Sequence, residues 1–227
     1  MAYEPLRSVP TLRVTSSHGW YSMLTEFGTV GLGIPGVQLA PGDHVCAFYP
    51  SLADRDEILI PYLREGLAAG DKCICVVDAT DPETVLAAVG AEEDLGSRLE
   101  GHQLDVQRSQ DTYLRGGAFS TSAMLDFWDR AVSGAVEGGF TFTRAAGEMT
   151  WALKQMPGVD ELVGYEARLN RFLPRYPQVI LCLYELDRFS GEVLVDVLKT
   201  HPKVLLGGMV LDNPYYLEPD EFLATRR

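Results

Sequence analysis

Two histidines and two cysteines are the residues of this chain best suited to hold a ligand or a metal ion. His44 and Cys46 are two positions apart in an apolar run typical of a β-strand, so their side chains project from one face. Cys182 lies in another such run, and His201 follows the helical segment after it. Two His and two Cys would suffice for tetrahedral zinc. Their spacing matches no zinc motif, however, and convergence would depend on folding alone. We therefore predict no metal and no cofactor, and interpret His44 as a core histidine bonded to a backbone group.

A second group of candidate residues follows a strand predicted over 140–144. The segment 144–153 contains Glu148 and Trp151. In open α/β sheets ligands bind outside the carboxyl ends of the strands. Trp151 would suit an apolar ligand, and Glu148 with Arg144 would fix its polar group. The alternative is that Trp151 simply packs against the following helix.

Catalytic chemistry has weaker support in the sequence. Cys46 with His44 or His201 could form a thiol–imidazole pair, although strand neighbours two positions apart do not automatically reach hydrogen-bond distance. Glu148 and Glu166 could act as paired carboxylates. The loop after the strand 43–49 lacks the glycines and the lysine that hold phosphates in nucleotide-binding proteins. ATPase activity is therefore not expected, and we favour a protein that is not an enzyme.

The elements that would position these residues alternate regularly. A helix over 54–69 shows one apolar face and ends at Gly70, and the run 178–184 is apolar at nearly every position. Such alternation predicts βαβ units, hence an α/β fold with a parallel sheet covered on both faces. Strands are predicted over 43–49, 72–78, 102–107, 140–144, 178–184 and 203–211, the last as an antiparallel or edge strand. Helices are predicted over 54–69, 82–91, 121–137, 159–174 and 190–199.

Composition excludes several functions. The formal net charge is −13, and the four lysines are scattered, so direct binding to nucleic acid is not expected. No run of about 18 apolar residues suggests a membrane span, and the N-terminus lacks a signal-peptide pattern. We expect a cytoplasmic protein whose four cysteines are reduced and buried. Residues 1–35 are predicted to form an N-terminal extension with a helix around 21–27, and residues 36–227 to form the domain.

Several segments together resemble the MEDS domain, the sensory domain of methanogens and methylotrophs. They are GDHVCAFY, EGLAAGDKCICVVD, TRAAGEMTWAL, GYEARLNR, VILCLYELDRFSGEVLVDVLKTHP and DNPYYLEP. The resemblance implies a RecA-like three-layer sandwich with a mostly parallel central sheet and a degenerate P-loop. It also implies the sensing of small molecules, including hydrocarbon derivatives. The positions that match family motifs are His44, Cys46, Tyr49, Gly147, Glu148, Met149, Trp151, Tyr165, Glu166, Cys182, Tyr184, His201, Pro202, Asn213, Pro214 and Tyr216.

On this resemblance we predict a stand-alone sensor that binds a small apolar ligand and signals to a separate regulator or kinase chain, because the chain has no room for a fused module. Trp151 and Tyr184 would supply apolar surface, Glu148 and Glu166 would orient the ligand, and Cys46 would sense soft or electrophilic groups. The alternatives are a biosynthetic enzyme that uses Cys46 or the Glu148/Glu166 pair, and a RecA-like interaction module that forms homo-oligomers. The predicted ligand-binding residues are His44, Cys46, Tyr49, Glu148, Trp151, Tyr165, Glu166, Cys182, Tyr184 and His201.

Overall fold

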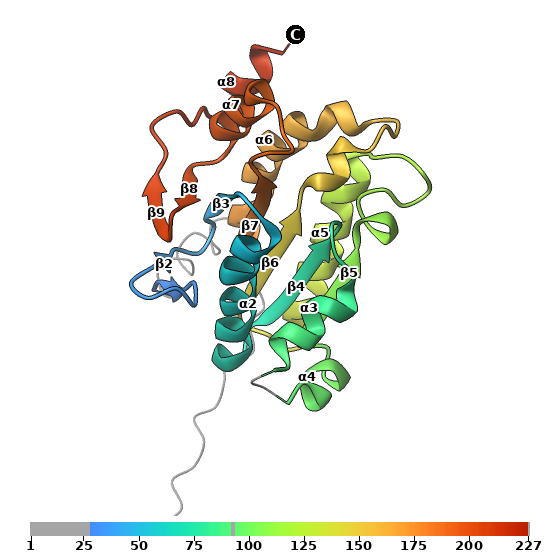
Figure 1. The fold of residues 1–227 in the computed structure, drawn as a ribbon, viewed down its shortest axis with the longest axis vertical. Coiled ribbons are helices and arrows are strands. Elements are labelled where there is room, and N and C mark those ends of the chain that lie inside the picture. The colour runs from blue at the N-terminus through green and yellow to red at the C-terminus, as the bar shows by residue number, and fades with distance from the viewer. Residues whose placement is uncertain (1–27, 92–93, 227) are drawn as a thin grey trace, which may run out of the picture.

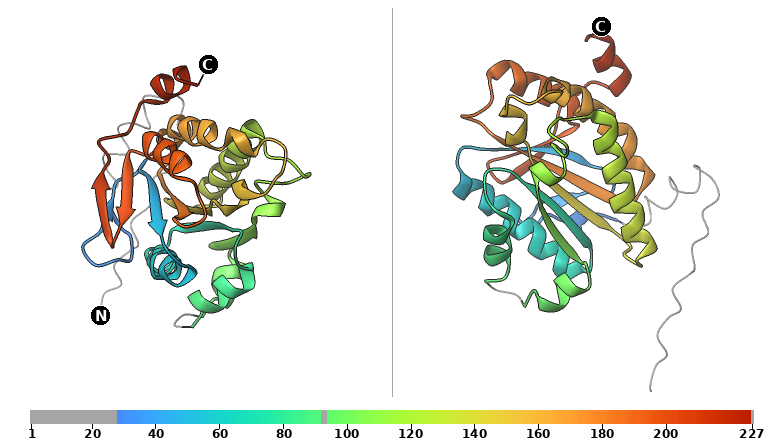
Figure 2. Two further views of the ribbon diagram at one scale, coloured as in Figure 1. Left: turned by 45° about the horizontal axis from the view of Figure 1, so that its top comes forward. Right: turned by 90° about the vertical axis from the view of Figure 1, so that its right-hand side faces the viewer.

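The computed structural model describes residues 28–91 and 94–226 and shows a seven-stranded sheet with helices on both faces (Figures 1 and 2). Its strands are β3 (His44–Tyr49), β4 (Lys72–Val77), β5 (Leu104–Arg108), β6 (Thr143–Glu148), β7 (Gln178–Glu185), β8 (Lys203–Leu206) and β9 (Met209–Asp212). A separate antiparallel ribbon consists of β1 (Val30–Gly31) and β2 (Gln38–Leu39). The α-helices are α2 (Leu52–Ala69), α3 (Pro82–Val89), α4 (Gly96–Glu100), α5 (Thr121–Glu137), α6 (Leu162–Phe172), α7 (Gly191–Thr200) and α8 (Pro219–Ala224). Short 3-10 helices are η1 (Ser109–Asp111), η2 (Thr150–Leu153), η3 (Val159–Glu161) and η4 (Leu173–Arg175).

The strand order confirms the predicted sheet. The strands are arranged as β5-β4-β6-β7-β3-β8-β9, and every neighbouring pair is parallel except β8 with β9. β3, the first strand of the sheet in sequence, therefore lies between two later strands. Parallel strands need helical crossovers, and these place helices on both faces. The result is the predicted three-layer sandwich.

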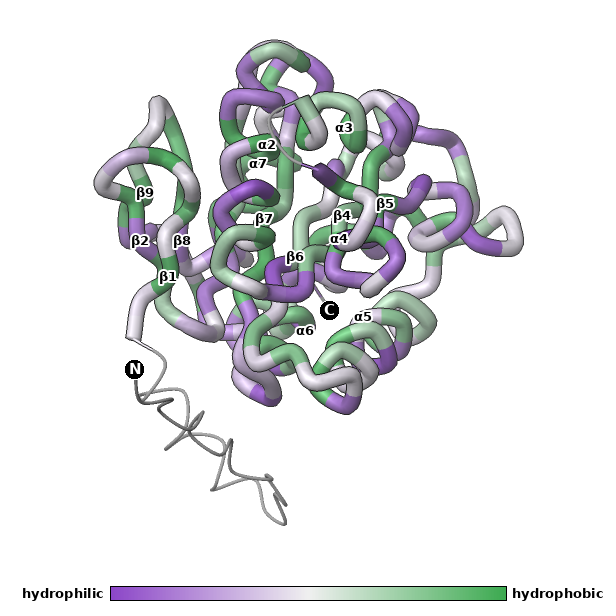
Figure 3. The backbone as a smooth tube through the Cα atoms, turned by 90° about the horizontal axis from the view of Figure 1, so that it is seen from below, coloured by the Kyte–Doolittle hydropathy of each residue, from purple (hydrophilic) through white to green (hydrophobic). Residues whose placement is uncertain are grey.

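Two apolar cores lie on the two faces of this sheet. On one face, here called the α6 face, α5, α6 and α7 contribute buried side chains such as Trp128, Leu169 and Val197. On the opposite face, here called the α2 face, α2 and α3 contribute residues such as Leu63 and Val89. Strands covered on both sides need apolar residues at successive positions. β7 accordingly appears mostly green in the hydropathy colouring (Figure 3).

The prediction of one strand over 203–211 is wrong. The segment forms a hairpin, β8 and β9, in which Leu206 pairs with Met209. Gly207 and Gly208 both have positive φ, at 57° and 75°. A two-residue loop with positive φ at both positions matches the twist of a tight hairpin, and glycine adopts it without steric cost.

The strand predicted over 140–144 lies further along the chain, at Thr143–Glu148. Its small residues Ala145, Ala146 and Gly147 resemble a loop in sequence but are buried between β4 and β7. A Cβ atom on Gly147 would come within 2.6 Å of the Tyr113 hydroxyl. Close packing over the strand, rather than loop formation, therefore explains this glycine. Glu148 consequently ends the strand instead of following it.

The predicted helices are present with small shifts at their ends. α2 begins at Leu52 because the Ser51 side chain accepts the amide hydrogen of Asp54 as an N-cap, and it ends at Gly70 with φ 83°. The helix predicted over 159–174 is α6 flanked by η3 and η4. α4 and α8 were not predicted. The helix predicted around 21–27 lies outside the described residues. Within those residues, no helix has the length and apolar character needed to cross a membrane.

Candidate functional site

A buried polar cluster lies on the α6 face of the sheet. His44 begins β3, Cys182 lies in the middle of β7, Glu166 lies on α6, and His201 follows α7. All four side chains are essentially inaccessible to solvent. His44 pairs with Ile180 in the β3–β7 register, so Cys182 lies two residues further along the neighbouring strand. Four segments distant in sequence thus converge on one point inside the protein.

The polar atoms of this cluster lie close together. His44 Nε2 is 3.2 Å from Glu166 Oε2 and 3.4 Å from Cys182 Sγ. His201 Nε2 is 3.6 Å from the same Glu166 oxygen, and Cys182 Sγ is 3.7 Å from it. The Tyr184 hydroxyl donates to the other carboxyl oxygen, Oε1, at 2.6 Å. Glu166 is therefore the centre of the cluster.

Hydrogen bonds on the outer side of each imidazole fix its tautomer. The Val197 carbonyl can only accept, and it lies 2.8 Å from His201 Nδ1, so this nitrogen carries the proton. The Asn170 amide nitrogen donates to backbone carbonyls, with that of Thr200 at 2.7 Å, so the amide oxygen faces His44 Nδ1 at 3.1 Å and accepts from it. Both neutral rings therefore direct an Nε2 lone pair toward Glu166. Within residues 28–91 and 94–226, His201 Nε2 has no hydrogen-bond partner.

Burial controls the charge of these groups. Desolvation lowers the pKa of His44 to about 3, and that of His201 to about 3 as well, with His44 nearby adding to the second effect. Both imidazoles are therefore neutral at neutral pH, and their contacts with the carboxyl group are not ion pairs. Burial also raises the pKa of Glu166, although His201, Tyr184 and Cys182 act in the opposite direction. The Cys182 thiol likewise has a raised pKa, chiefly through burial.

A second polar network lies on the α2 face, at the carboxyl ends of β4 and β6. Glu148 forms a buried ion pair with Arg55 of α2, and its Oε2 accepts the amide hydrogens of Asp78 at 2.5 Å and Ala79 at 2.9 Å. The Arg55 guanidinium also donates to Thr80 Oγ1 at 2.9 Å. A nucleotide-binding domain of this architecture would place phosphates beside the loop between β3 and α2. Here that loop has no glycine, and Arg55, in the first turns of the helix that follows it, is paired with Glu148.

The aromatic candidates belong to the core of the α6 face. Trp151 stacks on Tyr113 with ring centroids 4.6 Å apart and lies 4.5 Å from Phe119. Tyr165 accepts a hydrogen bond from Trp128 Nε1 at 2.8 Å. Trp151 and Tyr165 are both buried. Packing is therefore the observed role of these two side chains.

The predicted site residues thus separate into three groups. His44, Glu166, Cys182, Tyr184 and His201 converge in the buried cluster. Cys46 points to the same face but its thiol lies 3.7 Å from the Lys203 carbonyl instead. His44 is bonded to the Asn170 side chain, not to the backbone group that we had expected. The remaining predicted residues lie elsewhere. Tyr49 lies in the apolar core of the α2 face, Glu148 in the α2-face network, and Trp151 and Tyr165 in the aromatic core.

Some residues of the site were not identified from the sequence. Asn170 lies one helical turn after Glu166, a spacing that places both side chains on one helix face and could have revealed it. Arg55 lies between Asp54 and Asp56 in α2, and such a charged segment is typical of a solvent-exposed helix surface. Only the fold brings it to Glu148.

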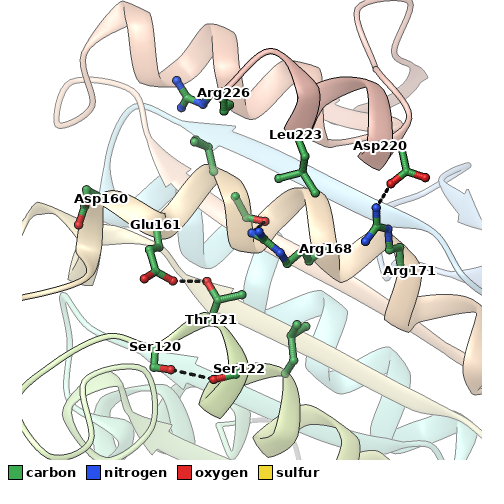
Figure 4. A pocket seen from close by; sticks show the side chains of 13 residues that line it. Ser120, Thr121, Ser122, Asp160, Glu161, Arg168, Arg171, Asp220, Leu223 and Arg226 are labelled. Carbon is green, nitrogen blue, oxygen red and sulfur yellow. Dashed lines mark hydrogen bonds and ion pairs between the residues drawn. The ribbon is translucent and has the colours of Figure 1, made fainter.

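Solvent-accessible depressions lie outside the cluster. An open cleft of about 1200 Å³ lies between α5, α6 and α8, where Thr121 donates to Glu161 at 2.7 Å and Arg171 pairs with Asp220 (Figure 4). A smaller groove of about 280 Å³ lies between α7 and the segment from η2 to α6. Most of its lining is apolar: Ala152, Leu153, Val159, Leu162, Val163, Phe189 and Val193.

Fold and sequence define the class to which this chain belongs. The fold is RecA-like: a KaiC-like protein from the archaeon Pyrococcus horikoshii OT3 superposes with a TM-score of 0.57, covering 78% of each chain at 13% identity. Residues 43–202 match the model of the MEDS family, the methanogen/methylotroph, DcmR sensory domain, and the chain belongs to this family.

One relative of this chain is a transcriptional repressor. The transcriptional repressor DcmR of Methylorubrum extorquens is 31% identical over 172 residues, which cover 74% of this chain and 61% of the repressor. The match thus spans less than two thirds of the repressor. The predicted family and fold are confirmed, and the chain carries a MEDS sensory domain.

Proposed function

We propose that this chain senses a small, largely apolar, hydrocarbon-derived molecule and passes the signal to a separate regulator or kinase chain in the cytoplasm. The observation that supports this proposal is the groove beside α7. Its wall is mostly apolar, and the charged residues of its lining, Asp160, Glu192, Asp196 and Arg226, offer contacts for one polar group. A volume of about 280 Å³ suits a molecule of a few carbon atoms.

The position of the groove connects a ligand to the buried cluster. Val193 of α7 and Val163 of α6 both line it. The same two helices lead to His201 and carry Glu166. Phe189, also in the lining, contacts Tyr184 with ring centroids 5.2 Å apart. A ligand that separates or tightens α6 and α7 would therefore alter the geometry of the cluster, and a partner chain would detect that change.

The structure gives less support to the two alternative functions. Burial, followed by the nearby Glu166, raises the pKa of the Cys46 thiol, which works against its use as a nucleophile. Glu148 and Glu166 belong to separate networks on opposite faces of the sheet, so they do not form a carboxylate pair. An interaction module that binds no ligand would not need the groove. Failure to bind any of the probes would favour this interaction module.

Methyl NMR provides the test. Dichloromethane, 2-propanol and toluene serve as probes, and the chemical shifts of Leu162, Val163 and Val193 report binding. Val193→Phe fills the groove and should weaken binding of the active probe at least tenfold. Val195→Phe, an equal change on the exposed side of the same helix, should leave it unchanged. Shifts confined to other sites, or equal effects of both variants, would contradict the proposal.

A further inference from the structure

We propose that His44, Glu166, Cys182 and His201 together bind one divalent transition-metal ion of the zinc class. This inference goes beyond ligand sensing at the groove and does not depend on it. Each residue offers one ligand atom, and these four atoms all lie within 4.8 Å of one another. The donor set of two imidazoles, one thiolate and one carboxylate is typical of Zn²⁺ or Co²⁺ and unlike the all-oxygen sets of Mg²⁺ and Ca²⁺.

The distances between the donor atoms fit a tetrahedral site. Zinc lies about 2.0–2.1 Å from nitrogen or oxygen ligands and about 2.3 Å from sulfur, so the edges of the tetrahedron should measure about 3.3–3.6 Å. The separations from Glu166 Oε2 are 3.2 Å to His44, 3.6 Å to His201 and 3.7 Å to Cys182. His44 Nε2 and Cys182 Sγ are 3.4 Å apart. Four of the six edges of the tetrahedron thus lie close to these values, and the other two, from His201 to His44 and to Cys182, lie within 4.8 Å.

Outer hydrogen bonds orient the ligands as they do in known metal sites. Each imidazole donates its Nδ1–H to an oxygen, that of Asn170 or of the Val197 carbonyl, which leaves Nε2 free to coordinate. Tyr184 holds the Oε1 atom of Glu166, so Oε2 is presented alone. Asn170 and Tyr184 are positioning residues in this arrangement.

An unpartnered buried atom points independently to a bound ion. His201 Nε2 is buried, carries a lone pair and has no hydrogen-bond partner among the residues that the structure describes, which is costly inside a protein. Coordination would satisfy this atom. A divalent ion would also balance the charges of one thiolate and one carboxylate, so the buried assembly would be neutral overall. Four protein ligands leave no position for water, which favours a structural or signalling role over catalysis.

The test uses the whole chain of 227 residues, purified without an affinity tag or chelator. Native mass spectrometry and elemental analysis should find one metal ion per chain. Stripped protein titrated with Co²⁺ should give an intense thiolate-to-cobalt charge-transfer band and the strong visible bands of tetrahedral cobalt. Saturation should occur at one equivalent. A folded wild-type protein, verified by circular dichroism, that takes up neither Zn²⁺ nor Co²⁺ would overturn the proposal.

Variants separate a specific site from incidental binding. Cys182→Ser should abolish the charge-transfer band. The same thiol-to-hydroxyl change at Cys75, a buried thiol on the α2 face, should leave it intact. If Cys182→Ser fails to fold, His201→Gln, which retains much of the side-chain volume, should weaken Co²⁺ binding and change the visible bands. Asn170→Leu should lower metal affinity about 10–100-fold with the charge-transfer band retained. Unchanged spectra in both folded Cys182→Ser and His201→Gln would overturn the site.

Discussion

Cys46 and Cys182 lie directly opposite each other in the parallel pairing of β3 with β7, but only Cys182 belongs to the polar cluster. The Cys182 thiol points to Glu166 Oε2 at 3.7 Å, whereas the Cys46 thiol lies 3.7 Å from the Lys203 carbonyl on the other side of β3. Adjacent thiols on one sheet face therefore have different surroundings. The β3–β8 pairing accounts for this difference, because it offers Cys46 a backbone acceptor.

The environment of Cys46 predicts slow chemical modification. Its pKa is raised by burial and then by the charge of Glu166, so the thiolate is scarce at neutral pH. We expect iodoacetamide at pH 8 to leave Cys46 unmodified in the folded protein over an hour. In denaturant all four cysteines should react, and peptide mapping by mass spectrometry distinguishes the two patterns. Rapid selective alkylation of Cys46 in the folded protein would instead support the enzyme hypothesis.

Trp151 is predicted to contribute mainly to stability. Trp151→Ala removes a fully buried ring stacked on Tyr113 and should lower the free energy of unfolding by about 3–5 kcal/mol. Trp151→Phe, which retains an aromatic ring, should cost substantially less. Urea denaturation followed by circular dichroism measures both. A loss below about 1 kcal/mol for Trp151→Ala would show that the ring is not part of the core.

The Arg55–Glu148 ion pair is predicted to show strong coupling. Arg55→Met leaves the Glu148 carboxylate buried without its cation, which should cost about 3–5 kcal/mol. Glu148→Gln keeps an oxygen for the Asp78 and Ala79 amides but removes the charge. The double variant should therefore lose much less stability than the sum of the single losses. A double-mutant cycle by denaturant unfolding tests this expectation, and additive losses would contradict it.

Replacement of Gly147 by a residue with a side chain is predicted to destabilise the protein, because the Tyr113 hydroxyl oxygen occupies the space of the new Cβ atom. In Gly147→Ala the new Cβ would meet the Tyr113 hydroxyl oxygen at 2.6 Å, whereas the next ring atom lies at 3.5 Å. We expect a loss of about 1–3 kcal/mol. Tyr113→Phe removes that oxygen and should restore part of the stability in the double variant.

A matched glycine serves as the control for this prediction. Gly134 lies within α5, and in the described part of the chain no atom outside its own helical turn lies within 4 Å of an added Cβ. Gly134→Ala should therefore raise the thermal midpoint, since alanine is favoured over glycine in helices by about 1 kcal/mol. If both alanine variants changed stability in the same direction, the steric explanation for Gly147 would fail.

Local patterns in the sequence determined most of the elements of this protein. The apolar run in β7 and the one-sided apolar pattern of α2 predict their structures because burial on both faces, or on one, requires those residues. The motifs also identified the family. The sequence pattern did not predict the hairpin at Gly207 and Gly208 or the full length of β6. Small residues occur both in loops and in buried strands, and only the residues packed against them distinguish the two cases.

Only the tertiary structure decided which candidate residues meet. The four residues of the buried cluster come from two strands, one helix and the end of another helix: His44, Cys182, Glu166 and His201. No sequence spacing relates them. Their convergence depends on β7 pairing with β3 and on α6 and α7 covering the same face. The sheet likewise separates Glu148 from Glu166, although either carboxyl group looked equally available in the sequence. The hydrophobic pattern of the sequence predicts which face of a strand or helix a side chain lies on. Tertiary packing determines which residues that side chain contacts.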